Sequence, residues 1–241
     1  MAESFASGMN FYKLFWVFFI GCFLGVVIET IWCLLRLGHI ESRAGLIYGP
    51  FNLVYGLGAL LMTITLVRFT GYRDLWLFLV GSLIGGIFEY ICSFVQEKLF
   101  GTVSWNYKNF PLNLNGRINM LYCFFWGLLA LVWVKDLYPR LAWLIEKIPN
   151  AYGKPLTWLC LIFMGFNTIM SSCVVYRMSE RQKGIQPSNV FWRYIDTHYD
   201  DERVKRIYPN MKLVGLMNKV KEKAKGEHTI FYKQQVQTKI D

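Results

Sequence analysis

Five long apolar segments place the strongest constraint on how this chain folds. Each approaches or exceeds the roughly 20 residues that an α-helix needs to cross a bilayer. They cover about residues 11–35, 44–67, 75–96, 118–134 and 156–176. With 54% hydrophobic and 17% charged residues, the 241-residue chain is too apolar for a soluble domain. We therefore expect an all-α, polytopic membrane protein with about five transmembrane helices. The first segment is too long for a secretory signal, and no small-residue cleavage site follows it.

The charge distribution divides the chain into a transmembrane domain, residues 1–176, and a basic tail, residues 177–241. The tail holds 14 Lys and Arg against 8 Asp and Glu, so it carries +6 of the net charge of +10. Five spans place the termini on opposite sides, but Lys and Arg near the membrane are nearly balanced, roughly eight against seven. Because translocating a large basic segment is costly, we expect an integral membrane protein with a cytoplasmic tail.

The first part of the tail, residues 187–212, has the pattern of an ordered helix. Ser188 is the predicted N-cap and Pro209 the predicted stop. The apolar positions that share one stripe are Val190, Phe191, Tyr194 and Ile195. A basic helical stretch, LMNKVKEKAKGE, follows. The tail is expected to bind either anionic lipid headgroups or a cytoplasmic partner. Nucleic acid is not expected, because nothing resembles a reading helix or an RNA-binding sheet.

The pattern G-x-x-x-G-x-x-x-E occurs twice, sixty residues apart. The first copy runs from Gly21 to Glu29 and the second from Gly81 to Glu89. We interpret spans one and two, and spans three and four, as two copies of a two-helix repeat, which places both carboxylates at similar depth. Glycines at i and i+4 remove side-chain bulk, so that another helix can approach the face that carries the glutamate one turn later.

A third G-x-x-x-G spacing, in GLIYGP, is followed directly by Pro50. A proline weakens a helix and frees backbone carbonyls. Interrupted helices beside a charged group are typical of transport sites. The predicted helix-packing or hinge residues are Gly21, Gly25, Gly45, Gly49, Pro50, Gly81 and Gly85. The same glycine faces predict a homodimer.

The loops after the first and third spans bring two arginines to the level of the two glutamates. Arg43 and Arg117 each precede the next predicted helix. A guanidinium can satisfy a carboxylate with two hydrogen bonds, or hold an anionic substrate. We expect one polar cluster of substrate-binding or coupling residues: Glu29, Arg43, Glu89, Asn113, Asn115 and Arg117. The alternative is two buried ion pairs, Glu29–Arg43 and Glu89–Arg117, that only lock the helix ends.

The loop of residues 101–118 is rich in aromatic and amide side chains. Trp105 and Tyr107 form either a lid over the cluster or part of an interfacial aromatic belt. Asn115 and Gly116 predict a turn, after which Arg117 opens the next helix. No cofactor or metal is expected: the six cysteines have no C-x-x-C spacing, and none of the three histidines lies in a span.

Two polar blocks resemble a known family. Arg43–Gly58 is similar to an R-G-x-L-x-G-P…Y-G-x-G block, with Ala44 inserted after the arginine, and Trp105–Ile118 is similar to a W-D/N-Y…N-x-N-G-R-I block. Over about residues 15–212, the chain thus resembles the bacterial family called Putative ABC-transporter type IV, or CmpB-like, permease proteins, and this resemblance implies a location in the bacterial cytoplasmic membrane. It implies the membrane-spanning part of a transporter. The segment YGKPLT lacks the leading glycine and the Ser or Thr of a nucleotide-binding loop, so an ATPase subunit would have to be separate.

Three functions fit these observations. A permease-like protein would move a small polar or ionic solute past the cluster. An intramembrane enzyme would use the carboxylates as acid and base on a lipid or lipid-linked substrate. A non-catalytic partner subunit would dock through its tail helix. We expect the first, and we expect no catalytic residues.

Overall fold

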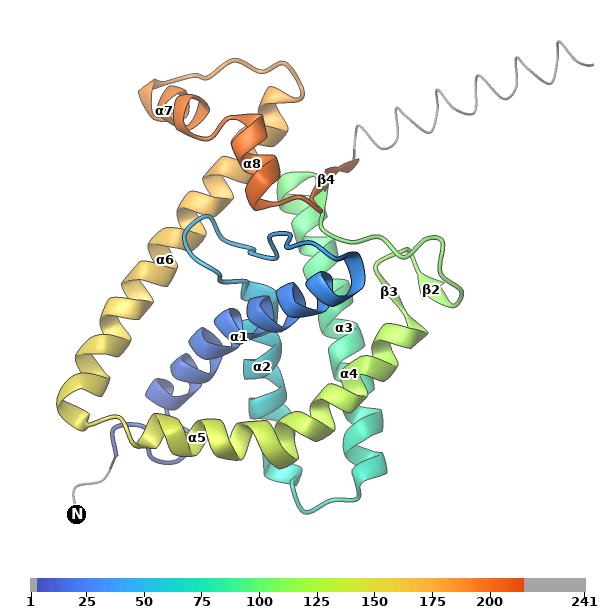
Figure 1. Ribbon diagram of the computed structural model, residues 1–241, viewed down its shortest axis with the longest axis vertical. Helices are drawn as coiled ribbons and strands as arrows, with labels where there is room; N and C mark the ends of the chain where they lie inside the picture. Colours follow the sequence, from blue (N-terminus) through green and yellow to red (C-terminus); the bar gives the residue numbers. More distant parts are fainter. Residues whose placement is uncertain (1–3, 215–241) are drawn as a thin grey trace, which may run out of the picture.

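The computed structural model describes residues 4–214, and long helices dominate it (Figure 1). Among these residues, four helices are long and apolar enough to cross a membrane. They are α1 (Phe11–Leu37), α3 (Asp74–Phe100), the continuous helix of Met120–Glu146 and α6 (Asn150–Arg181). This confirms the all-α polytopic fold. The helix of Met120–Glu146 consists of α4 (Met120–Val132), a π-helical segment η2 (Trp133–Leu137) and α5 (Tyr138–Glu146).

The second expected span differs most from its predicted bounds. Helix α2 covers only Leu53–Leu66 and ends in a 3₁₀ turn, η1 (Val67–Phe69). Residues 44–52 are not helical. Asn52 caps α2, because its side chain accepts a hydrogen bond from the backbone N–H of Val54. The second apolar segment is therefore a shorter helix preceded by an irregular stretch of backbone.

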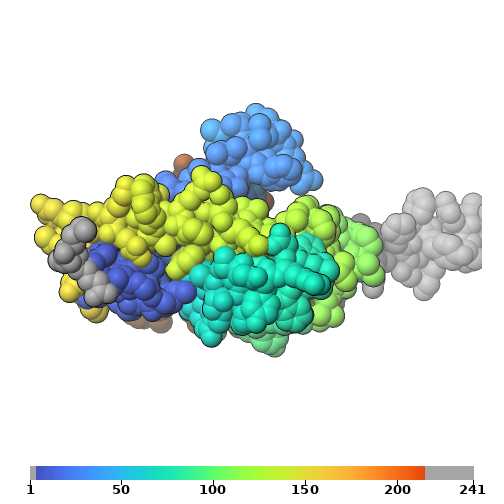
Figure 2. All heavy atoms as spheres, turned by 90° about the horizontal axis from the view of Figure 1, so that it is seen from below, coloured from blue at the N-terminus to red at the C-terminus, as the bar shows by residue number. Residues whose placement is uncertain are grey.

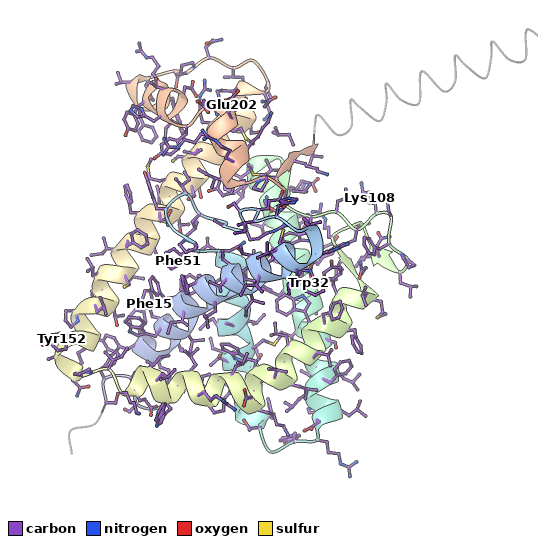
Figure 3. The ribbon with its side chains drawn as sticks, viewed as in Figure 1. Phe15, Trp32, Phe51, Lys108, Tyr152 and Glu202 are labelled. Atoms are coloured by element: carbon purple, nitrogen blue, oxygen red, sulfur yellow. The ribbon has the colours of Figure 1, made fainter. Side chains whose placement is uncertain are left out.

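The helices pack in sequential antiparallel pairs, α1 with α2 and α3 with α4 (Figure 1). The N-terminal residues lie at the turn between α5 and α6, and the described C-terminal residues lie at the far end of α6. Tyr152 and Glu202, labelled in Figure 3, mark these two ends. Beside the N-terminus, the buried Lys13 pairs with Glu146 of α5, which ties α1 to α5.

The end of α1 and the segment after it project from one side of the molecule (Figure 2). Trp32, Leu35 and Ile40 are 62%, 77% and 73% exposed there. Apolar side chains exposed on a membrane-spanning helix are suited to contact with lipid tails.

The C-terminal cap, residues 182–213, folds over one end of the helices. It contains α7 (Val190–His198), α8 (Asp201–Ile207) and the strand β4 (Lys212–Leu213), which pairs antiparallel with β1 (Thr102–Val103). The cap is ordered, as expected for residues 187–212, but the single helix predicted there is wrong, because the chain breaks at residues 199–200 into two helices. Asn189 caps α7 in place of Ser188. The stretch LMNKVKEKAKGE lies outside the described residues.

Candidate functional site

A groove of about 900 Å³ lies among α2, α3, α4 and α6, a size typical of small-molecule sites. Glu29 of α1 and Glu89 of α3 both line it. The loops after α1 and α3 line it as well, through residues 42–46 and 104–107, and residues 208–211 of the cap contribute to its wall. The groove therefore gathers residues from nearly every part of the fold.

Glu29 is held by one hydroxyl and one guanidinium. The Tyr55 hydroxyl, from the first turn of α2, donates to its carboxylate. Arg43 Nη1 lies 3.7 Å from Glu29 Oε1, so the predicted Glu29–Arg43 ion pair is present. Arg43 also donates at 2.7 Å to Glu41 and at 3.0 Å to the Cys33 sulfur. One guanidinium thus serves two carboxylates beside the groove.

Glu89 is held by two aromatic donors. The Tyr107 hydroxyl donates to Oε1 at 2.8 Å, and the Trp126 indole N–H donates to Oε2 at 2.7 Å. Tyr107 also stacks on Tyr122, with the ring centroids 4.4 Å apart. Burial and the charge of Glu89 raise the pKa of the Tyr107 hydroxyl, so this group remains a donor across the physiological pH range. Glu89 itself is 6% exposed.

The six predicted residues do not form one cluster, and of the two alternative ion pairs the Glu89–Arg117 pair is not formed. Arg117 Nη2 pairs with Glu97 Oε2 at 2.7 Å, two turns further along α3. Asn115 donates to the Tyr90 hydroxyl at 2.9 Å. Asn113 accepts from the Gly116 backbone N–H at 2.9 Å within its own loop. None of these three lines the groove, whereas Glu29, Arg43 and Glu89 do.

A tight hairpin explains where these three residues lie. The strands β2 (Asn113–Leu114) and β3 (Ile118–Asn119) pair across residues 115–117, with Leu114 opposite Ile118. Asn115 and Gly116 have φ values of +54° and +70°, as the two central residues of a type I′ turn require, and the Arg117 N–H donates to the Leu114 carbonyl at 3.0 Å. The turn predicted from the sequence is therefore present, but Arg117 belongs to the hairpin and α4 begins only at Met120. The hairpin carries Arg117 away from the groove.

The loop before this hairpin brings its aromatic side chains to the groove. The Trp105 indole N–H donates to the Arg117 carbonyl at 2.9 Å, and the Tyr107 N–H donates to the Gly116 carbonyl at 2.8 Å. Both aromatic side chains line the groove. Residues 104–107 thus fold back over Glu89.

The two glycine–glutamate patterns make matching contacts. A Cβ on Gly25 would lie 2.2 Å from the Tyr55 ring, and one on Gly85 would lie 2.4 Å from the Trp126 ring. In each pair, the aromatic residue packed on the second glycine also donates to the glutamate one turn later. The first glycines match too: the nearest side chain to Gly21 is Ala59 and the nearest to Gly81 is Ala130.

These contacts cover the glycine faces from within the chain. Gly21 and Gly25 pack against α2, and Gly81 and Gly85 pack against α4. These four glycines are therefore not available to a second copy of the chain. The homodimer expected from the glycine faces stays a prediction.

The GLIYGP segment is not helical, so the helix-packing role expected for it is wrong, whereas its role as a hinge stays a prediction. Its backbone is irregular, and Gly49 has a φ of +77°. A Cβ on Gly45 would lie 2.8 Å from the Asn52 side chain. Pro50 follows Gly49 in this turn, before α2 begins, so it interrupts no helix.

Two polar residues of α6 hold this irregular backbone, and the sequence reading missed both. Asn167 accepts from the Tyr48 N–H at 3.1 Å and donates to the Tyr48 carbonyl at 2.7 Å. Ser171 accepts from the Ile47 N–H at 2.9 Å. Irregular backbone at membrane depth needs such partners. The sequence indicates these two residues through the stretch FNTIMSS, whose polar side chains interrupt the last apolar segment.

Comparison with protein families decides the identity of the membrane domain. The model of the family described as Putative ABC-transporter type IV matches residues 16–172, more than half of the chain. This protein belongs to that family. Comparisons with curated proteins and with solved structures gave no match. The matched region of this ABC-transporter-type protein runs from α1 into α6, so it contains Glu29, Arg43 and Glu89 and ends before the cap. The family and the four long apolar helices together indicate an integral membrane protein of the transporter type.

Proposed function

We propose that this protein is the permease-like membrane component of a transporter, and that a small polar or ionic solute passes through the groove. The observation that carries the proposal is that Glu29 and Glu89, from two different helix pairs, line the same groove of about 900 Å³. Charged side chains within membrane segments usually face a cavity and mark a solute pathway. Glu29, Arg43 and Glu89 are the proposed solute-binding or coupling residues.

The matching contacts support an internal repeat behind this arrangement. Spans α1–α2 and α3–α4 each present a glutamate beside an aromatic donor from the partner helix. Repeats in transporters commonly place their binding site where the two copies meet, and motion of one copy against the other then opens the site to either side. We propose that Trp105 and Tyr107 act as the lid over Glu89 during this motion.

The energy source lies outside this chain in our proposal. The sequence contains no G-x-x-x-x-G-K-[ST] loop, so ATP hydrolysis would come from a separate subunit. The cap is the proposed contact for that subunit, on the cytoplasmic side of a bacterial cytoplasmic membrane. Residues 208–211 of the cap line the groove, which gives a docked partner a direct route to the solute site.

The test compares cells that contain the wild-type protein with cells that contain the Glu29→Gln, Glu89→Gln double variant at equal membrane amounts. Mass spectrometry of cell contents and medium is expected to find at least one small polar or ionic solute whose distribution depends on the wild-type protein. The double variant is expected to lose this dependence. The matched control is Asp136→Asn, which removes an exposed carboxylate of η2 that does not line the groove.

Either of two outcomes would contradict the proposal. One is a solute distribution that the double variant maintains in full. The other is an unchanged solute distribution together with a changed lipid composition, which would favour an enzyme acting on lipids.

A further inference from the structure

We infer that the occupant of the groove is a lipophilic organic cation, a small organic ammonium or phosphonium compound with an apolar body. This inference rests on the proposed function, because it names the solute class of the same groove. Its basis is the combination of excess negative charge, aromatic faces and apolar walls that the groove presents.

The charge balance of the groove is negative. Among the described residues that line it, the charged side chains are Glu29, Arg43 and Glu89. Arg43 is not free to neutralise both glutamates, because it pairs with Glu29 and with Glu41. The ion pairs among the described residues include none to Glu89. Carboxylates at membrane depth usually pair with a cation, so a cationic occupant would complete the Glu89 environment.

Aromatic rings surround this carboxylate. Tyr107 and Trp126 donate to it, Tyr122 stacks on Tyr107, and Phe88 packs edge-on against Trp126 with centroids 6.0 Å apart. All four rings line the groove. The negative faces of aromatic rings attract cations, by about 0.5–1 kcal/mol at exposed sites and about 2 or more where water is excluded. Aromatic cages of this kind are the usual binding sites of quaternary ammonium groups.

The remaining walls of the groove suit an organic cation better than a hydrated inorganic ion. Much of the lining is apolar and comes from several helices, including Leu57, Ile91, Val95, Leu129 and Val175. A small inorganic cation would lose its hydration against these side chains without replacement ligands. An organic cation instead buries its own apolar surface there, which is favourable at about 25 cal/mol per Å². The volume of about 900 Å³ admits a molecule of several rings.

The test uses two ions of the same shape and opposite charge, tetraphenylphosphonium and tetraphenylborate. Equilibrium binding of each is measured on the full-length protein in nanodiscs of phosphatidylglycerol. We expect saturable binding of the cation and at least about tenfold weaker binding of the anion, a difference of about 1.4 kcal/mol. Glu89→Gln is expected to weaken cation binding at least about tenfold, whereas Asp136→Asn is expected to leave it unchanged. Equal binding of both ions, or full binding by Glu89→Gln, would overturn the inference.

A second pair of variants keeps the test informative if Glu89→Gln disturbs the fold. Tyr122→Leu removes an aromatic face and keeps apolar volume, and Tyr122→Phe keeps the ring. Cation binding is expected to be several-fold tighter in Tyr122→Phe than in Tyr122→Leu. Equal affinities would argue against the aromatic cage.

A third arm separates a free solute from a lipid headgroup. Replacing half of the phosphatidylglycerol by phosphatidylethanolamine lowers the surface charge equally for the wild type and for Glu89→Gln, so the ratio of their cation affinities is expected to stay unchanged. A ratio that falls toward one would show that an ammonium lipid occupies the groove, and it would overturn a free organic cation as the occupant.

Failure of this inference is distinguishable from failure of the proposed function. If the solute distribution in cells depends on the two glutamates but the phosphonium ion does not bind, the proposed transport function is supported and the proposed ligand class is contradicted. If the phosphonium ion binds in a Glu89-dependent way but the distribution of no solute depends on the glutamates, the cation-binding site is supported and the transport role is contradicted.

Discussion

At the scale of single residues, four glycines determine how closely the helices approach and so where the two glutamates lie. A Cβ on Gly81 would come within 2.2 Å of the Ala130 Cβ, and one on Gly21 within 2.9 Å of the Ala59 Cβ. Helices in a membrane associate largely through such close packing, because lipid tails are as apolar as the side chains. Any larger residue at these positions must separate the helices that carry Glu89 and Trp126, or Glu29 and Tyr55.

Gly81→Ala is therefore expected to destabilise the protein, by about 1–3 kcal/mol for an overpacked contact. The control is Gly165→Ala, also within a long helix, where an added Cβ meets no atom within 4 Å. It is expected to be neutral or stabilising by about 0.5–1 kcal/mol. The measurement is the temperature at which each detergent-solubilised variant loses its monodisperse peak. Equal temperatures for the two variants would contradict the role of close packing.

At the scale of elements, the cap is joined to α6 by a network of charged side chains. Arg177, which is 1% exposed, donates to both carboxylate oxygens of Asp196 at 2.8–3.1 Å. Arg181 donates to Asp196 and Asp201, each at 2.7 Å. Burial pushes the pKa of Asp196 upward, but the hydrogen bonds and charges of Arg177 and Arg181 outweigh it and hold that pKa below its ordinary value of 3.8.

The pH dependence follows from the direction of this shift. A carboxyl whose pKa is lower in the folded state than in the unfolded state stabilises the fold at pH values above its ordinary pKa, here 3.8. This stabilisation is lost as the pH falls through the pKa of Asp196 in the folded state. We expect α7 and α8 to lose hydrogen-exchange protection below about pH 4, after correction for intrinsic exchange rates. Asp196→Asn is expected to lose protection already at pH 7, because the buried Arg177 then loses its paired carboxylate in α7 and keeps only its ion pair with Glu180.

The matched control for this experiment is Glu202→Gln, on the exposed first turn of α8 (Figure 3). It is expected to keep full protection at pH 7. If Asp196→Asn behaves like this control, the charged network does not hold the cap.

At the scale of the whole molecule, the cap and the membrane domain form a connected unit. The Tyr48 and Tyr199 hydroxyls lie 2.6 Å apart, and the Ser42 hydroxyl donates to the Ile207 carbonyl at 2.8 Å. Together with the β1–β4 pairing, these contacts join the cap to the loops after α1 and α3, whose residues line the groove. A force applied to the cap would therefore reach the groove through short, direct contacts.

The exposed apolar side chains of α7 offer a surface for that force. Phe191 and Tyr194 are 44% and 50% exposed. Native mass spectrometry of the protein, purified in mild detergent from the membranes of its own organism, is expected to show an additional ATP-hydrolysing subunit. The Phe191→Ser, Tyr194→Ser variant is expected to lose this subunit while it remains monodisperse. A mass that corresponds only to one or more copies of this chain would contradict an ATPase partner.

Much of the architecture follows from local sequence properties. The apolar segments indicate membrane helices because their lengths match the bilayer. The repeated glycine–glutamate spacing places each carboxylate on the face that its neighbouring helix approaches. The Glu29–Arg43 pair was predictable because the loop between the two residues is short. Each of these inferences depends on residues that are close in sequence.

The remaining features depend on contacts between distant residues, which local patterns do not determine. The backbone around Tyr48 is irregular because Asn167 and Ser171, on the last long helix, satisfy its hydrogen bonds. Glu89 is held by Trp126, an aromatic residue that local pattern alone does not distinguish from its lipid-facing neighbours. By itself, the sequence determined the membrane helices and the helix face that carries each of the two carboxylates. Only the tertiary structure decided which donors reach each carboxylate, because those partners come from other helices.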